Sequence, residues 1–342
     1  NATLLEFAAV EIDGPRLKQE IRDLMEGNFN RRGGRQRLYL SSTAKSGGNF
    51  DARLRVINGL PLQIRAQEFY RIWLNFRRYL GDWSANRRFN SEIMSELLDE
   101  IKVRIDRCHK AAKARYGTCA VVGNSGILLN QSHGALIDSH DAVIRLNNAR
   151  IRSFERHVGS KTTVSFINSN ILHLCARRPG CFCHPYGDSV PIVMYICQPI
   201  HFFDYLLCNS SQRAPILITD PQFDLLCARI VKYYSVRRFM RLTGNDSGDW
   251  NGAHDGANFH YSSGMQAVML AVGMCERVSV FGFGKGELGS SSRHHYHTSQ
   301  KAELSLHDYE AEYEFYRDLI ERPEMIPFIS GGFKPPVVVM YR

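Results

Sequence analysis

Short apolar runs separated by turn residues dominate the chain from about residue 119 onward. The runs at 120–122, 142–146, 190–196, 215–219 and 278–281 are short and mostly β-branched, as in buried strands. Between them, residues 223–238 and 263–275 carry apolar side chains at helical spacing. Strands that alternate with helices indicate a mostly parallel sheet with helices on both faces. We therefore predict an α/β fold of Rossmann-like architecture.

The first third of the chain has a different pattern. Residues 15–25 and 60–79 show helical spacing, and the stretch between them at 27–50 is rich in Gly, Arg and Ser, which indicates a loop or weakly ordered hairpin. A longer amphipathic helix is predicted over 91–112. We expect N-terminal helices before the sheet, a partly ordered segment over 1–60 and a single α/β domain over 61–342.

The composition is that of a globular protein with a basic surface. The 342 residues carry a net charge of +9 at pH 7, which fits an acidic partner such as a sugar phosphate, a polyanionic glycan or nucleic acid. The densest basic clusters lie at 31–37 and 77–78. No RNA-binding or helix-turn-helix signature accompanies them, so we expect a solvated basic face and no nucleic-acid partner. No apolar stretch reaches the ~18 residues that cross a bilayer.

Nine cysteines and four N-x-Ser/Thr sites are compatible with an oxidising secretory compartment. The group Cys175, Cys181, Cys183 and His184 could also be a zinc site, because thiolates and imidazoles bind zinc. Its spacing lacks a C-x-x-C pair, which favours disulfides or buried thiols. The chain contains no Asp-x-Asp sequence, so nucleotide binding through a divalent metal is not indicated.

Two segments combine a strand with residues suited to a nucleotide. The run at 120–122 ends in a turn at 123–126, where glycines let the backbone approach a ligand and Asn124 and Ser125 supply hydrogen-bonding groups. The run at 142–146 delivers Asn147 at its carboxyl end, where ligands bind in open α/β sheets. Either segment alone also fits an ordinary strand and turn. Neither the G-x-G-x-x-G fingerprint nor the P-loop sequence is present.

A third segment could bind phosphate. Ser262, Ser263 and Gly264 directly precede an apolar helical stretch. Free N–H groups and the dipole at the N-terminus of a helix attract phosphate. Taken alone, the same residues fit a plain helix cap.

Four segments in a fixed order resemble the motifs of the sialyltransferases, which are CMP-sugar glycosyltransferases. Residues 119–126 with 143–148 resemble the large sialylmotif, and 262–264 with 275–284 resemble the small one. His295 and Tyr296 are similar to the start of the third motif, although His297 replaces an aromatic residue and Thr298 an acid. His307, followed five positions later by Glu312, reproduces the very small motif. The resemblance covers about 119–328 and is greatest to the plant sialyltransferase-like proteins of glycosyltransferase family 29.

The resemblance implies a role for each of these residues. The family transfers a 3-deoxy-2-ulosonic acid from its CMP ester with inversion, which requires a base and stabilisation of the departing phosphate. By this match His307 is the base, and His295 hydrogen-bonds the phosphate. Glu312 and Tyr296 support the site, and Cys119 and Cys275 form the disulfide between the two motifs. The residues expected to hold the nucleotide, phosphate and donor are Asn124, Ser125, Asn147, Ser262, Ser263, Gly264, Gly282 and Gly284.

The resemblance also implies partners and a location. We expect a CMP-activated donor, a glycan acceptor, no cofactor and no metal, on a GT-A-like variant of the fold. A plant-like member implies Kdo as the sugar and pectic rhamnogalacturonan II as the acceptor, with sialic acid as the broader family donor. We expect a Golgi lumen location, a type II membrane anchor N-terminal to Asn1, and a stem over 1–60. The alternatives are UDP-galactose transfer to arabinogalactan and a catalytically silent glycan- or nucleotide-binding protein, although the presence of His295 and His307 favours an enzyme.

Overall fold

One sheet of seven strands, all parallel, forms the centre of the described molecule. The computed structural model describes residues 102–103, 105–106, 115–175, 186–187, 189–195, 216–219, 221–254, 261–284, 293–298, 307–329 and 333–341. The strands are β1 (Tyr116–Val122), β2 (Ala142–Leu146), β3 (Val164–Asn168), β4 (Ile192–Tyr195), β5 (Ile216–Ile218), β6 (Cys275–Phe281) and β7 (Val337–Tyr341). The predicted α/β fold with a parallel sheet is confirmed.

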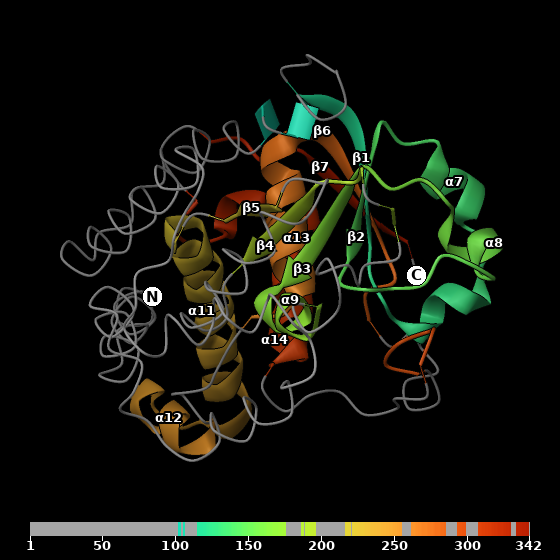
Figure 1. Cartoon of the computed structure of the whole chain (residues 1–342). Coiled ribbons are helices and arrows are strands. Elements are labelled where there is room, and N and C mark those ends of the chain that lie inside the picture. Colours follow the sequence, from blue (N-terminus) through green and yellow to red (C-terminus); the bar gives the residue numbers. More distant parts are fainter. Residues whose placement is uncertain are drawn as a thin grey trace, which may run out of the picture.

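Helices cover both faces of this sheet (Figure 1). The α-helices are α7 (Gly134–Asp138), α8 (Glu155–Val158), α9 (Ser169–Cys175), α11 (Pro221–Thr243), α12 (Trp250–Ala253), α13 (Ser263–Met274) and α14 (Tyr309–Glu321), and the 3₁₀ helices are η3 (Gly126–Asn130), η6 (Ser247–Asp249) and η7 (Pro323–Met325). In β1, Cys119 and Val121 pack in the core with α11, α13 and α14, whereas Ala120 and Val122 pack with η3, α7 and α8. The alternation follows from the two-residue period of a strand.

The burial of helix α13 accounts for its mostly apolar sequence. Each of its residues is buried, because the helix lies between the sheet and other helices. No helix within the described ranges is both long and apolar enough to cross a membrane.

The direction in which strands are added to the sheet reverses between β1 and β6. The order is β5-β4-β3-β2-β1-β6-β7, so the chain moves outward from β1 to β5 and then places β6 and β7 on the other side of β1. Ligands in open α/β sheets bind beyond the carboxyl ends of the strands where the order reverses in this way. Because α13 leads directly into β6, the N-terminus of α13 lies at the same edge.

A disulfide joins the neighbouring strands β1 and β6. Cys119 in β1 is bonded to Cys275, which directly follows α13 and is the first residue of β6. In the strand register Cys119 pairs with Val278 and Tyr116 with Cys275, so the disulfide runs diagonally between neighbouring strands. The structure thus contains the disulfide that the family resemblance implied.

Several boundaries differ from the prediction. The helix α11 extends past residue 238 to Thr243, because it packs along α14. We did not predict β3, in which the buried Ser165 interrupts the apolar pattern, or the edge strand β7. The predicted helices at 15–25 and 60–79, the loop at 27–50, the basic clusters and most of the helix at 91–112 lie outside the described residues.

Replacing Cys119 and Cys275 together with serine should lower the free energy of unfolding. Their disulfide spans 156 residues of sequence. Closing so long a loop lowers the conformational entropy of the unfolded chain, which stabilises the fold by about 5 kcal/mol. Urea denaturation of the variant and of the oxidised and reduced wild type measures this difference. Reduced wild type should match the variant, and equal stability of the oxidised wild type and the variant would contradict the assignment.

Candidate functional site

The carboxyl ends of β1 and β6 meet in a tightly packed corner. Gly123 donates its N–H to the carbonyl of Phe281 at 2.7 Å, and Ser125 donates its N–H to the carbonyl of Gly282 at 3.2 Å. The Ser125 hydroxyl donates to the carbonyl of Gly284 at 2.6 Å. The residues predicted from two distant segments therefore lie side by side.

Glycines make this packing possible. Gly282 has a φ of 74° and Gly284 a φ of 103°, in the region that glycine adopts without strain. A Cβ on Gly123 would lie 2.5 Å from the Gly282 carbonyl, and a Cβ on Gly264 would lie 2.7 Å from the ring of Phe283. We expected glycines here for their close approach to a donor. The close approach that the structure shows is between segments of the protein itself.

The segment 293–298, which carries the third motif, docks on the same corner. Gly126 donates its N–H to the carbonyl of Arg293 at 2.9 Å, and Tyr296 donates its N–H to the carbonyl of Asn124 at 2.8 Å. The side chain of Tyr296 is buried, and its hydroxyl donates to the carbonyl of Arg150. Burial raises the pKa of Tyr296 to about 12. Tyr296 is thus a neutral anchor that fixes the histidines on either side of it.

His295 and His297 present parallel imidazole rings, with centroids 5.7 Å apart. Burial, together with the neighbouring His294 and His297, lowers the pKa of His295 to about 4. Burial and the charge of Arg150 also lower the pKa of His297. Because a neutral imidazole has one donor and one acceptor nitrogen, His295 can donate one hydrogen bond to a phosphate.

A chain of polar groups runs along the ends of β2, β3 and β4. The side-chain oxygen of Asn147 accepts the N–H of Asn168 at 3.2 Å. The Asn168 amide donates to the Ser263 hydroxyl at 3.1 Å, and the Tyr195 hydroxyl lies 3.2 Å from the same oxygen. Asn147 and Ser263 were predicted, whereas Asn168 and Tyr195 were missed. Asn168 ends β3 just as Asn147 follows β2, so recognition of β3 in the sequence would have indicated it.

Glu312 binds the residue that begins α13. The Ser262 hydroxyl accepts the N–H of Met265 at 3.1 Å and donates to Glu312 Oε2 at 2.5 Å, while the Ser262 N–H donates to Glu312 Oε1 at 2.7 Å. The Tyr316 hydroxyl donates to Oε2 at 3.4 Å. Burial raises the pKa of Glu312 to about 7, although the hydrogen bonds from Ser262 act against this shift. Glu312 thus connects α14 to the N-terminus of α13.

His307 precedes α14 and is linked to the third motif through aromatic rings. The ring of Tyr309 packs edge-to-face against His307 at 5.5 Å and against His294 at 5.7 Å between centroids. The rings of His294 and His295 are 4.3 Å apart. The structure therefore connects both histidines that were predicted to be catalytic within one ring cluster.

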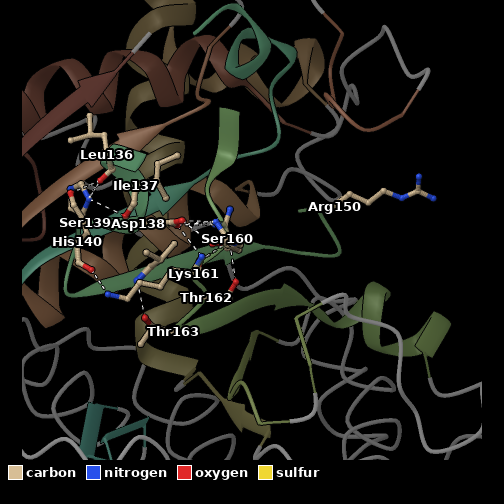
Figure 2. A network of polar contacts seen from close by, with 12 residues as sticks. Leu136, Ile137, Asp138, Ser139, His140, Arg150, Ser160, Lys161, Thr162 and Thr163 are labelled. Carbon is tan, nitrogen blue, oxygen red and sulfur yellow. Dashed lines mark hydrogen bonds and ion pairs between the residues drawn. The ribbon is translucent and has the colours of Figure 1, made fainter. Parts of the chain in front are cut away.

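A polar network fixes the loop that leads into β3. Figure 2 shows Asp138 directed toward Ser160, the Lys161 side chain extending toward His140, and Arg150 pointing away. Asp138 accepts the N–H groups of Ser160 and Lys161, each at 2.9 Å. Burial raises the pKa of Asp138, but these hydrogen bonds and the charge of Arg145 outweigh it and hold the pKa below its usual value. The ionised carboxylate therefore stabilises the loop beside β2 (Figure 2).

Two buried side-chain atoms at the corner have no hydrogen-bond partner within the described residues. They are Oδ1 of Asn124 and Nε2 of His297, which lie on segments joined by the backbone bond from Tyr296 to Asn124. Because buried polar atoms are nearly always paired, these two atoms are candidates to pair with a bound water molecule or with a polar ligand group. Asn124 can accept a hydrogen bond there.

Metal ligands do not gather in the described part of the chain. No group of three or more His, Cys, Asp or Glu residues suited to a metal occurs in those ranges. The alternative zinc site at 175–184 lies almost wholly outside them. Metal independence stays an expectation.

Changing Glu312 to glutamine should alter how stability depends on pH. The folded-state pKa of about 7 lies above the ordinary value of 4.5, so protonated Glu312 favours the fold below pH 4.5 and this contribution is lost as the pH rises through 7. Over that interval the free energy of unfolding of the wild type should fall relative to the variant by on the order of 2 kcal/mol. Urea denaturation across this range measures it. Glu310→Gln, at an exposed position on the same helix, is the control and should follow the wild type.

Comparison with known proteins places the chain in a family. The family model described as "Glycosyltransferase family 29 (sialyltransferase)" matches residues 63–323. A β-1,6-galactosyltransferase, GALT29A, of Arabidopsis thaliana is 53% identical over 352 residues, which cover all of this chain and 86% of the relative. Sialyltransferase-like protein 1 of Oryza sativa subsp. japonica is 50% identical over 361 residues, covering all of this chain and 88% of the relative. A crystal structure of a mammalian sialyltransferase aligns with 81% of this chain and 85% of its own, at 21% identity and a TM-score of 0.44. On the family model and the two full-length relatives, the chain belongs to glycosyltransferase family 29, the sialyltransferase family.

Proposed function

We propose that this protein transfers a sugar from a nucleotide to a hydroxyl group of a glycan, with inversion and with His307 as the general base. The observation that carries this proposal is the convergence of the four motifs on the carboxyl edge of β1 and β6. Membership of glycosyltransferase family 29 supports the reaction class.

In this mechanism the nucleotide lies beyond β1 and β6. The N-terminus of α13 favours the phosphate through its dipole, His295 donates one hydrogen bond to it, and Asn124 accepts one from the ligand. The acceptor hydroxyl attacks the anomeric carbon, and the bond from that carbon to the phosphate oxygen breaks. His307 takes the hydroxyl proton, and the nucleotide leaves with the bonding electrons.

We favour UDP-galactose as the donor. The support is the relative from Arabidopsis thaliana, a β-1,6-galactosyltransferase that is 53% identical over the full length of this chain. A galactosyl acceptor, as in arabinogalactan, would then be the substrate.

A CMP-activated ulosonic acid is the second candidate donor. Its support is the set of motifs that this chain shares with sialyltransferases, from Asn124 to Glu312, and relatives of similar identity that are sialyltransferase-like proteins. Kdo on rhamnogalacturonan II, or sialic acid on another glycan, would then be transferred. With either donor we propose a Golgi lumen location.

A donor panel decides between these candidates. UDP-galactose, CMP-Kdo and CMP-sialic acid are tested for thermal stabilisation and for transfer to a galactan and to rhamnogalacturonan II, in the presence of EDTA. A donor at ~100 times its dissociation constant should stabilise the fold by roughly 2.7 kcal/mol. Binding without transfer would instead support the catalytically silent protein, and restoration of binding only by added Mg²⁺ or Mn²⁺ would contradict metal independence.

Replacing His307 with alanine should lower kcat 10²- to 10⁴-fold, because a positioned base contributes about this much to proton transfer. The affinity for the free nucleotide should change little, since the base acts on the acceptor hydroxyl. Initial rates and calorimetric titration of the nucleotide measure the two effects. A folded variant with near-normal transfer would rule out His307 as the base.

His295→Ala should behave differently from His307→Ala. Loss of a hydrogen bond to the phosphate should weaken nucleotide binding and slow departure of the leaving group, so affinity and kcat should fall together. The same titration and rate measurements check it. A loss of kcat with unchanged nucleotide affinity would remove His295 from the phosphate site.

A further inference from the structure

The residue after His307 has an unusual set of partners. Asp308 is the N-cap of α14: its carboxylate accepts the N–H of Ala311 at 3.1 Å, and its carbonyl accepts the N–H of Glu312 at 3.1 Å. An N-cap residue is where the chain turns from extended to helical geometry. The position of Asp308 therefore affects the position of His307, which directly precedes it in the chain.

The Asp308 carboxylate is also held by groups from another part of the chain. The Ser235 hydroxyl of α11 donates to Oδ2 at 2.7 Å. Arg238 of the same helix lies 3.6 Å from Oδ1, and His254, directly after α12, lies 3.7 Å from Oδ2. Only 8% of the Asp308 side chain is exposed. Helix capping uses only the N–H groups of the same helix. The additional contacts connect the start of α14 to α11 and to His254.

Ser235 is itself held in place. Trp250, which is fully buried, donates its indole N–H to the Ser235 hydroxyl at 3.0 Å. A chain of hydrogen bonds thus runs from Trp250 through Ser235 to Asp308. It ends one residue away from His307.

Attachment of α14 to α11 does not depend on Asp308 alone. Farther along α14, Asp318 accepts hydrogen bonds from Tyr234 at 2.9 Å and from Arg237 at 3.3 Å. Arg322 donates to the other oxygen of Asp318 at 2.7 Å. Asp318 is ten residues from Asp308 and fixes the body of the helix. Asp308 fixes the N-terminal end of α14, next to His307.

We propose that Asp308 is a positioning residue for His307, acting with Ser235 as its support. The inference rests on the proposed role of His307 as the base. A displacement of about 1 Å in a reacting group can cost on the order of 100-fold in rate, so a clamp at the adjacent residue is well placed to govern turnover.

The test compares Asp308→Asn with Asp318→Asn. Asparagine caps helices as well as aspartate does, so the first variant keeps the cap but loses the charge that attracts Arg238 and the carboxylate oxygen that accepts from Ser235. Its kcat should fall on the order of 10- to 100-fold with little change in the KM for the donor. Asp318→Asn should lower the melting temperature and leave kcat close to wild type. Ser235→Ala should lower kcat in the same direction as Asp308→Asn but by less.

A second measurement reports position without turnover. With isotope-labelled histidine, the imidazole resonance of His307 is assigned by its loss in His307→Gln. It should shift in Asp308→Asn and stay in place in Asp318→Asn. An unshifted resonance in Asp308→Asn, or equal losses of kcat in the two aspartate variants, would overturn the proposal. If wild type transferred no sugar from any donor, the proposed function would fail, while the resonance would still decide whether Asp308 positions His307.

Discussion

The parallel pairing of β1 with β6 is the constraint on which the site depends. These strands are far apart in sequence, and their register from Tyr116–Cys275 to Val122–Phe281 sets the two glycine-containing turns against each other. A slip of one residue would move Cys119 to the opposite face and separate it from Cys275. Because α13 continues directly into β6, the same register fixes the N-terminus of α13. The disulfide therefore holds a pairing that positions both halves of the site.

Buried carboxylates place α14 against this frame. Glu312 binds Ser262 of α13, whereas Asp308 and Asp318 bind side chains of α11. Removing water from a carboxylate is costly, and removing one partner of a buried charge can cost about 3 to 5 kcal/mol. Such groups tolerate few alternative positions, since each must keep its donors. Apolar contacts attach α14 to the core, and the hydrogen bonds of the carboxylates fix the position of α14 along its own axis.

Much of this arrangement follows from local sequence. The apolar runs of β1 and β2 and the mostly apolar α13 were predicted because burial on all sides requires mostly apolar residues. The role of Glu312 as a support followed from its motif. Asn168 was missed because β3 was not recognised, and Asp308 was missed because its partner Ser235 lies 73 residues away in the sequence. Spacing within one segment carries no information about such partners.

The roles of the glycines also could not be predicted from local sequence alone. We predicted Gly282 and Gly284 as donor-binding residues because glycine admits a close approach. In the structure the carbonyl of Gly282 accepts the N–H of Ser125 from the turn after β1, and a Cβ on Gly282 would lie 2.6 Å from the Leu128 side chain. The sequence identified a position where a side chain does not fit. Only the packing in the structure shows which group occupies the space that a side chain would need.

The electrostatics of the site couple ligand binding to pH. His295 and His297 are neutral because burial disfavours the imidazolium form. In the proposed mechanism an anionic phosphate lies beside His295 and favours its protonated form. Protonated Glu312 likewise favours the fold. A base at His307, by contrast, must be neutral to accept the acceptor's proton. In the proposed mechanism, acidity therefore favours phosphate binding by His295 and disfavours proton acceptance by His307, so the two titrations act on turnover in opposite directions.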